Sequence, residues 1–200
     1  MTELLIATHN PGKLREFLAI FDGLGLTLRT LDEVAVAEDI EETGETFEEN
    51  ARLKAEGYAA LTGLPTLADD SGLEVAALNG APGVYSARYG GLKGAAQLDY
   101  LLKQLEGVPW NARLARFVCV IALKLPGRDA ELMEGTLPGV IELAPRGTGG
   151  FGYDPLFYLL DEDKTLAELP EARKNQISHR AAAARAARDV LERWRGEGLL

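Results

Sequence analysis

Cysteine and histidine are scarce in this sequence of 200 residues: Cys119 is the one cysteine, and His9 and His179 are the two histidines. A single cysteine excludes an internal disulfide and indicates a reducing compartment. The cysteine and the histidines also lack the spacing of zinc ligands, which makes a zinc centre a poor interpretation. A G-x-S-x-G nucleophile elbow is missing as well, so serine-hydrolase chemistry is poorly supported.

Positive charge and long apolar runs are the other two deficits. The net charge is −10, whereas general nucleic-acid and membrane binders need a surplus of lysine and arginine. No apolar stretch approaches the roughly 20 residues that a membrane-spanning helix needs. Met1, Thr2 and Glu3 carry no basic region of the kind that opens a signal peptide. We therefore predict a cytoplasmic protein with one domain, undivided or two-lobed, over residues 1–200.

The first strand and helix form a candidate anion site. Residues 4–7 are typical of a short buried strand, and Asn10 with Pro11 combines a preferred N-cap with a preferred first helical residue. The apolar stripe of this helix is expected to consist of Leu14, Phe17, Leu18 and Phe21. Lys13 lies in the first turn, where the helix dipole disfavours a cation unless an anion binds there. Alternatively, Lys13 is a solvated lysine.

An acidic connector and a second helix follow. After a strand expected over 26–31, the acids of residues 38–49 are interpreted mostly as a solvated face. Thr46 and Glu49 have the spacing of a capping box and predict a helix start. The stripe of this helix is expected to consist of Phe47, Ala51, Ala55, Tyr58 and either Leu61 or Thr62. Lys54 falls near the edge of the stripe, where its amine either reaches a cleft or snorkels to solvent.

Asp69 and Asp70 are adjacent carboxylates at the point where a short strand over 66–68 is expected to end. Mutual repulsion would raise the pKa of one of them unless a divalent cation or a phosphate-binding group lies nearby. The carboxyl ends of strands are also where open α/β sheets usually bind ligands. Alternatively, the stretch through Ser71 and Gly72 is a solvated turn.

The remaining chain alternates strand and helix patterns. We expect a helix with the stripe Leu98, Leu101, Leu102 and Leu105, a long strand over 114–125, its hairpin partner over 131–136, a short strand over 140–143 and a last helix over 175–195. Residues 147–155 are either a flexible glycine-rich loop or a platform on which a base stacks. Lys174, Ser178, His179 and Arg180 cluster at the expected start of the last helix, where an anion would again be favourable. The pattern predicts a nucleotide-binding α/β protein.

Three collinear blocks resemble the inosine-triphosphate pyrophosphatase family, the non-canonical purine nucleoside-triphosphate pyrophosphatases. The blocks are ATHNPGK at 7–13, ADDSGL at 68–73 with GAPGVYSARY at 80–89, and GGFGYDP at 149–155 with KNQISHR at 174–180. The similarity runs from residue 4 to beyond residue 180. One departure is His9, which stands where the family commonly has glycine.

The resemblance implies hydrolysis of ITP, dITP and XTP to the nucleoside monophosphate and pyrophosphate, with Mg²⁺ as cofactor. It makes Asp70 the general base and, together with Glu42, a metal ligand, while the role of Asp69 stays open. Substrate binding is implied for Thr8, His9, Asn10, Pro11, Gly12, Lys13, Lys54, Ser71, Phe151, Gly152, Tyr153, Asp154, Lys174, His179 and Arg180. Within this set Phe151 would stack on the purine, and the last four residues would read its edge.

The resemblance also implies an elongated α/β fold with a mixed sheet, and two lobes flanking a nucleotide cleft. The expected partners are the nucleotide substrate and a second copy of the chain in a homodimer, without nucleic acid or membrane. Two other functions remain open from the sequence. One is a Maf-like pyrophosphatase acting on modified pyrimidine nucleotides, and the other is a nucleotide sensor without turnover.

Overall fold

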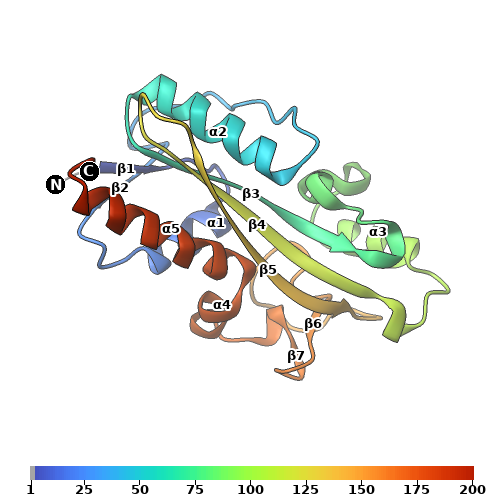
Figure 1. Cartoon of the computed structure of the whole chain (residues 1–200). Helices are drawn as coiled ribbons and strands as arrows, with labels where there is room; N and C mark the ends of the chain where they lie inside the picture. The colour runs from blue at the N-terminus through green and yellow to red at the C-terminus, as the bar shows by residue number, and fades with distance from the viewer. Residues whose placement is uncertain (1–2) are drawn as a thin grey trace. The chain divides into compact units, whose positions relative to one another are not determined.

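The computed structural model describes residues 3–200 as two compact units (Figure 1). Unit 1 comprises the residues up to Asp70 together with Cys119–Gly135 and Arg180–Leu200, and unit 2 comprises Ser71–Val118 and Thr136–His179. Met1 and Thr2, two of the residues that argue against a signal peptide, lie outside the described part of the chain. No helix in the described part is long and apolar enough to cross a membrane.

The fold is mixed α/β with a seven-stranded sheet in the order β2-β1-β3-β4-β5-β6-β7. The strands are β1 (Glu3–Ile6), β2 (Thr27–Thr30), β3 (Thr66–Val75), β4 (Leu114–Lys124), β5 (Glu131–Ile141), β6 (Phe157–Leu159) and β7 (Lys164–Thr165). β1 pairs in parallel with β2 and β3, whereas β6 pairs antiparallel with β5 and β7. The sheet is therefore mixed, as the family resemblance implies.

The helices are α1 (Pro11–Ile20), α2 (Phe47–Thr62), α3 (Ala95–Gln104), α4 (Glu171–Ile177) and α5 (His179–Gly196), with short 3-10 helices η1 (Ala76–Leu78), η2 (Gly83–Gly91), η3 (Trp110–Ala112) and η4 (Leu166–Glu168). Two predicted helix starts are confirmed. The Asn10 side chain accepts hydrogen bonds from the first turn of α1, and Thr46 and Glu49 form the capping box of α2.

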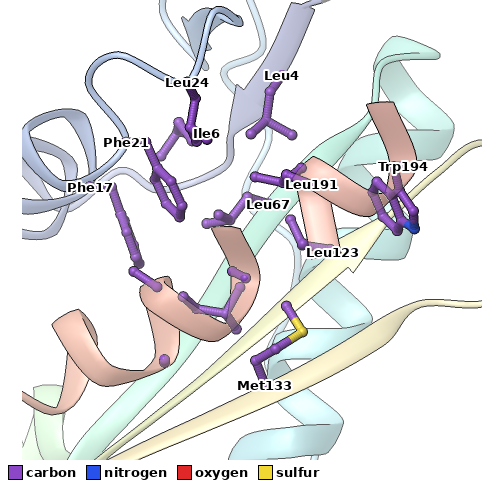
Figure 2. Close-up of a cluster of buried hydrophobic side chains, with 14 of the residues drawn as sticks. Leu4, Ile6, Phe17, Phe21, Leu24, Leu67, Leu123, Met133, Leu191 and Trp194 are labelled. Atoms are coloured by element: carbon purple, nitrogen blue, oxygen red, sulfur yellow. The ribbon is translucent and has the colours of Figure 1, made fainter. Parts of the chain in front are cut away.

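In unit 1, α1 and α5 pack on one face of the sheet and α2 lies on the other (Figure 1). Figure 2 shows Phe17 of α1, Phe21 just after its end, and Leu191 and Trp194 of α5 around Leu67 of β3. The expected stripes are confirmed except at Leu18, whose side chain is exposed, and of the two alternatives at the end of α2 it is Thr62 that is half-buried while Leu61 is exposed. The two helix layers give β3 a different neighbour on each face, which positions the site described below.

In unit 2, α3 and the segments around β6 and η4 build a second apolar core. The Phe117 and Phe157 rings lie 4.5 Å apart by their centroids, and the buried Leu98 and Leu101 of α3 belong to the same cluster. The short strand expected over 140–143 is not separate, because β5 continues without a break to Ile141.

Two further boundaries differ from the expectation. β3 does not end at residue 68 as expected but continues through Ser71 and Gly72 to Val75, so the alternative interpretation as a solvated turn is wrong. The last helix is two helices, because Ser178 adopts an extended conformation (φ −64°, ψ 158°) between α4 and α5. Lys174 therefore lies in the last turn of α4, while His179 begins α5.

Candidate active site

The start of α1 fixes the backbone around Lys13 and sends its side chain towards β3. The Asn10 Oδ1 accepts the N–H groups of Gly12 and Lys13 at 2.9 and 3.2 Å, and Thr8 Oγ1 accepts the N–H of Asn10. The Lys13 Nζ lies 3.0 Å from Asp69 Oδ2. Lys13 is thus held by a buried carboxylate instead of being a solvated lysine.

Asp69 is a buried anion surrounded by cations on the face of the sheet covered by α1 and α5. Besides Lys13, the Arg180 Nη2 lies 3.7 Å from Asp69 Oδ2, and the Cys119 Sγ is also 3.7 Å away. Arg180 also forms an ion pair with Glu16 of α1. Burial alone would raise the pKa of Asp69, but Lys13 and Arg180 outweigh it and hold this pKa well below its usual range.

Asp70 faces α2, because consecutive side chains of a strand point to opposite faces of the sheet. Lys54 of α2 places its Nζ 3.6 Å from Asp70 Oδ1, and Asn50 donates from Nδ2 to Asp70 Oδ2 at 3.1 Å. Burial raises the pKa of Asp70 above its ordinary value, with Lys54 acting in the opposite direction and Glu42 in the same one. The repulsion expected between adjacent aspartates is reduced because the carboxylates lie on opposite faces of the sheet, where Lys13 and Arg180 contact Asp69 and Lys54 contacts Asp70.

Glu42 and Asp70 face one cation, the Lys54 ammonium group. Its Nζ lies 2.5 Å from Glu42 Oε1, and burial would lower the pKa of Lys54, but the charges of Asp70, Asp69 and Glu42 raise it overall. Oxygen ligands of this kind suit Mg²⁺, which usually takes one or two carboxylates plus substrate phosphates. The described residues contain no group of three or more His, Cys, Asp or Glu residues that could hold a metal. Glu42 and Asp70 would therefore need phosphate and water oxygens to complete a Mg²⁺ site.

In unit 2, Phe151, Asp154 and Lys174 form one compact group. The buried Asp154 Oδ2 accepts the main-chain N–H of Phe151 at 2.9 Å and lies 2.5 Å from Lys174 Nζ. Lys174 Nζ lies 4.5 Å from the centroid of the Phe151 ring. Gly150 is required here, because its φ is +71° and a Cβ would lie 2.0 Å from Asp154 Oδ2. The glycine-rich segment is thus held by a buried acid and is not a plain flexible loop.

The remaining expected residues are variously buried, half-buried or exposed. The His179 ring stacks on Phe117 with centroids 4.7 Å apart, and the buried Tyr153 hydroxyl donates to the Ser86 carbonyl at 3.0 Å. His9 is exposed, and the centroid of its ring lies 6.3 Å from that of the Tyr58 ring in an edge-to-face arrangement. Pro11 and Gly152 are exposed and Ser71 is half-buried. Arg180 belongs to unit 1, so its role in reading the purine edge stays a prediction.

Comparison with known proteins decides the family. The model of the Ham1 family matches residues 4–190, nearly the whole chain. The chain belongs to the Ham1 family. Among curated relatives, this Ham1 chain is 52% identical over 198 residues to a dITP/XTP pyrophosphatase of Geobacter sulfurreducens, covering 98% of this chain and 99% of that one. It is 47% identical over 194 residues to the dITP/XTP pyrophosphatase of Bacillus subtilis, covering 96% and 98%.

Solved Ham1 structures have the same fold. A HAM1 protein from Coxiella burnetii superposes with a TM-score of 0.88 at 44% identity, over 96% of this chain and all 100% of that one. The Staphylococcus aureus Ham1 protein gives a TM-score of 0.86 at 44% identity, over 96% and 98%. The family resemblance found in the sequence blocks is therefore confirmed.

Two polar residues of this Ham1 site are missing from the expectation. The sequence does contain a hint of Asn50, because this polar residue directly precedes Ala51 on the face of α2 that is buried. It contains no such hint of Glu16, since this partner of Arg180 lies outside the expected stripe and Arg180 is distant in sequence. Contacts that join segments far apart along the chain leave no local pattern.

Proposed function

We propose that this Ham1 protein hydrolyses dITP, ITP and XTP to the nucleoside monophosphate and pyrophosphate, and so clears them from the nucleotide pool. The observation that carries the proposal is the Asp70 carboxylate, held between Lys54 and Asn50 with Glu42 on the same lysine. Relatives named dITP/XTP pyrophosphatase at about half identity support the substrate class.

In the proposed reaction Asp70 takes a proton from the water that attacks the α-phosphorus. The bond between that phosphorus and the bridging oxygen breaks, and pyrophosphate leaves. The raised pKa of Asp70 makes it a stronger base than an ordinary aspartate. Glu42 and Asp70 would hold Mg²⁺, which when bound neutralises phosphate charge and polarises the phosphoryl oxygens.

The charge balance of the unit 1 cluster supports a metal requirement. Its four carboxylates, Asp69, Asp70, Glu42 and Glu16, outnumber its three cations, Lys13, Lys54 and Arg180. A triphosphate adds several negative charges, so an extra divalent cation is needed to offset them. Lys13 and Lys54, assisted by Thr8, Asn10 and Ser71, are the proposed ligands of the phosphate oxygens, with His9, Pro11 and Gly12 completing the loop.

For the base, Phe151 is the proposed stacking platform, and Asp154 and Lys174 read the purine edge with His179 and Arg180. Hypoxanthine and xanthine present a 6-keto acceptor where adenine presents an amino donor. A buried donor that the wrong base leaves without an acceptor discriminates by roughly 10⁴-fold, which apolar fit does not achieve. Gly152 and Tyr153 hold the segment that carries Phe151.

The proposal also covers domain organisation, oligomeric state and cellular location. Residues 1–200 act as a single pyrophosphatase domain, and the chain forms a homodimer, as the family resemblance implies. The single cysteine suits a reducing compartment, which supports a cytoplasmic location. Sedimentation of the full chain would give the oligomeric state.

A panel of nucleoside triphosphates, assayed for pyrophosphate release with Mg²⁺ and with chelator, tests the function. We expect ITP, dITP and XTP to be turned over well above ATP, dTTP and UTP, and only with the metal. Turnover of dTTP or UTP well above ITP would favour the Maf-like alternative. Tight binding of ITP without pyrophosphate release would indicate a sensor.

A further inference from the structure

Asn50 is a buried amide that uses both of its ends. It is 1% exposed, so its polar atoms would destabilise the fold if they lacked partners. The Oδ1 accepts the main-chain N–H of Gly44 at 2.8 Å, and the Nδ2 donates to Asp70 Oδ2 at 3.1 Å. Because an N–H can be met only by the carbonyl end, the contact with Gly44 fixes which end faces Asp70.

We propose that Asn50 is a positioning residue that sets the orientation of the Asp70 carboxylate. The inference rests on the proposed role of Asp70 as the general base. The terminal torsion of an aspartate is soft, so the plane of its carboxylate is set by the partners of its two oxygens. Asn50 holds Oδ2 towards α2, which leaves Oδ1 directed at Lys54 and the Glu42 side. In this arrangement Asn50 holds Oδ2 in place, and Oδ1 faces the side where the proposed reaction occurs.

The orientation of the Asn50 side chain depends on Gly44, which lies in the acidic connector of residues 38–49. A Cβ at Gly44 would lie 2.6 Å from the Glu49 Cβ and 2.7 Å from the Asn50 Oδ1. The Glu49 Cβ belongs to a capped helix turn and cannot easily move, so the connector at residue 44 would have to shift away and take its N–H from the Asn50 Oδ1. The absence of a side chain at Gly44 therefore lets the connector reach Asn50, which in turn reaches Asp70.

The test compares Asn50→Ala, Asn50→Asp and Gly44→Ala in the full-length enzyme, with ITP and saturating Mg²⁺. Asn50→Asp keeps the shape and replaces the donor by an acceptor. We expect kcat to fall on the order of 10- to 100-fold in both Asn50 variants, because misplacement of a reacting group slows the chemical step. KM should change by less than about threefold, since substrate contacts are intact. Gly44→Ala should show a smaller fall of the same kind.

Thr46→Ala is the matched control for a merely structural effect. It removes the cap of the same helix, where Thr46 Oγ1 accepts the Glu49 N–H, without touching Asp70. We expect a lower Tm and an unchanged kcat in this variant. A second readout is non-additivity: Gly44→Ala and Asn50→Ala act through one amide, so the double variant should be no slower than Asn50→Ala alone.

The outcomes separate this inference from the proposed function. Asn50→Ala with wild-type kcat, or with a kcat loss that Thr46→Ala matches at equal Tm, overturns the positioning role while Asp70→Asn remains inactive. A wild-type enzyme that releases no pyrophosphate from any triphosphate overturns the proposed function instead. An Asp70→Asn variant with near-normal turnover removes the base assignment on which the inference rests. A crystal structure of Asn50→Ala should show the Asp70 carboxylate rotated, and an unrotated carboxylate also counts against the proposal.

Discussion

Unit 1 and unit 2 each place a lysine beside a buried aspartate, but they surround the pair differently. In unit 1 the pair of Lys13 and Asp69 extends through Arg180 to Glu16. In unit 2 the pair of Lys174 and Asp154 is completed by a main-chain N–H and an aromatic ring. One unit thus presents a dense charge cluster, and the other a single oriented pair against a flat apolar surface.

The difference is the one that the proposed function requires of a phosphate-binding group and a base-binding group. A phosphate chain is a mobile polyanion without fixed directions, so several cations around it bind it better than one ideal hydrogen bond. A purine is neutral and planar, and it is recognised by stacking and by donors in fixed positions. The comparison therefore predicts that variants at Lys13 and Asp70 of unit 1 change phosphate binding and catalysis, whereas variants at Phe151 of unit 2 change base recognition.

The largest expected effect is that of Asp70→Asn. The amide keeps the size of the side chain but cannot take a proton, and a general base contributes about 10²–10⁴-fold to rate. We expect kcat for ITP to fall by about that factor, while the dissociation constant of ITP, measured by calorimetry with Ca²⁺ in place of Mg²⁺, changes little. Turnover within a few-fold of the wild type would remove Asp70 from its role.

An effect of intermediate size is expected when phosphate binding and base binding are measured separately. Tripolyphosphate carries the phosphate chain without a base, so it should inhibit through the proposed phosphate ligands and not through Phe151. Lys13→Met should weaken this inhibition by about tenfold or more, since hydrogen bonds to charged groups contribute about 1.5–3 kcal/mol. Phe151→Ala should leave the inhibition constant unchanged and raise KM for ITP by about tenfold, the loss of one base stack.

The result that would break the comparison is a crossed pattern. If Phe151→Ala weakened tripolyphosphate inhibition as much as Lys13→Met, the assignment of phosphates to unit 1 would be wrong. Leu61→Ala is a suitable control, because this side chain is exposed in the last turn of α2 and belongs to neither group. Its inhibition constant and KM should equal those of the wild type.

Local sequence patterns predict much of this fold. The cap at Asn10 and the capping box at Thr46 and Glu49 are confirmed because both ends of each interaction lie within four residues. The apolar stripes succeed for the same reason, except at Leu18. Burial at this position depends on where the stripe ends against the sheet, and a helical periodicity does not contain that information.

The main error of the sequence-based prediction concerns the charged and polar residues inside β3. A run of two aspartates, a serine and a glycine has poor strand propensity, yet β3 continues through all four. Tertiary contacts override the propensity, because Lys13, Lys54 and Arg180 arrive from helices that are distant in sequence. The resemblance identified most of the candidate residues, but only the structure shows that the two aspartates face opposite layers.

The smallest expected effect is on the pH dependence of stability, and it tests whether Asp69 and Asp70 lie in different environments. The folded pKa of Asp69 is lowered, so its ionised form stabilises the fold above the unfolded pKa of about 3.9, and this contribution is lost as pH falls. The folded pKa of Asp70 is raised, so its ionised form costs stability at neutral pH, and that cost disappears on acidification. The two neighbours should therefore respond to acid with opposite signs.

Melting curves of the wild type, Asp69→Asn and Asp70→Asn between about pH 7 and pH 3 make the comparison. The Tm deficit of Asp69→Asn relative to the wild type should shrink as the pH approaches about 3, because the unfolded wild type then takes up a proton on Asp69 while the folded state keeps this carboxylate ionised. The Tm of Asp70→Asn relative to the wild type should fall over the same range, because the wild type is relieved of its buried charge. Differences of a few degrees are expected, and equal slopes for the two variants would mean that both carboxylates share one environment, against the alternation of β3.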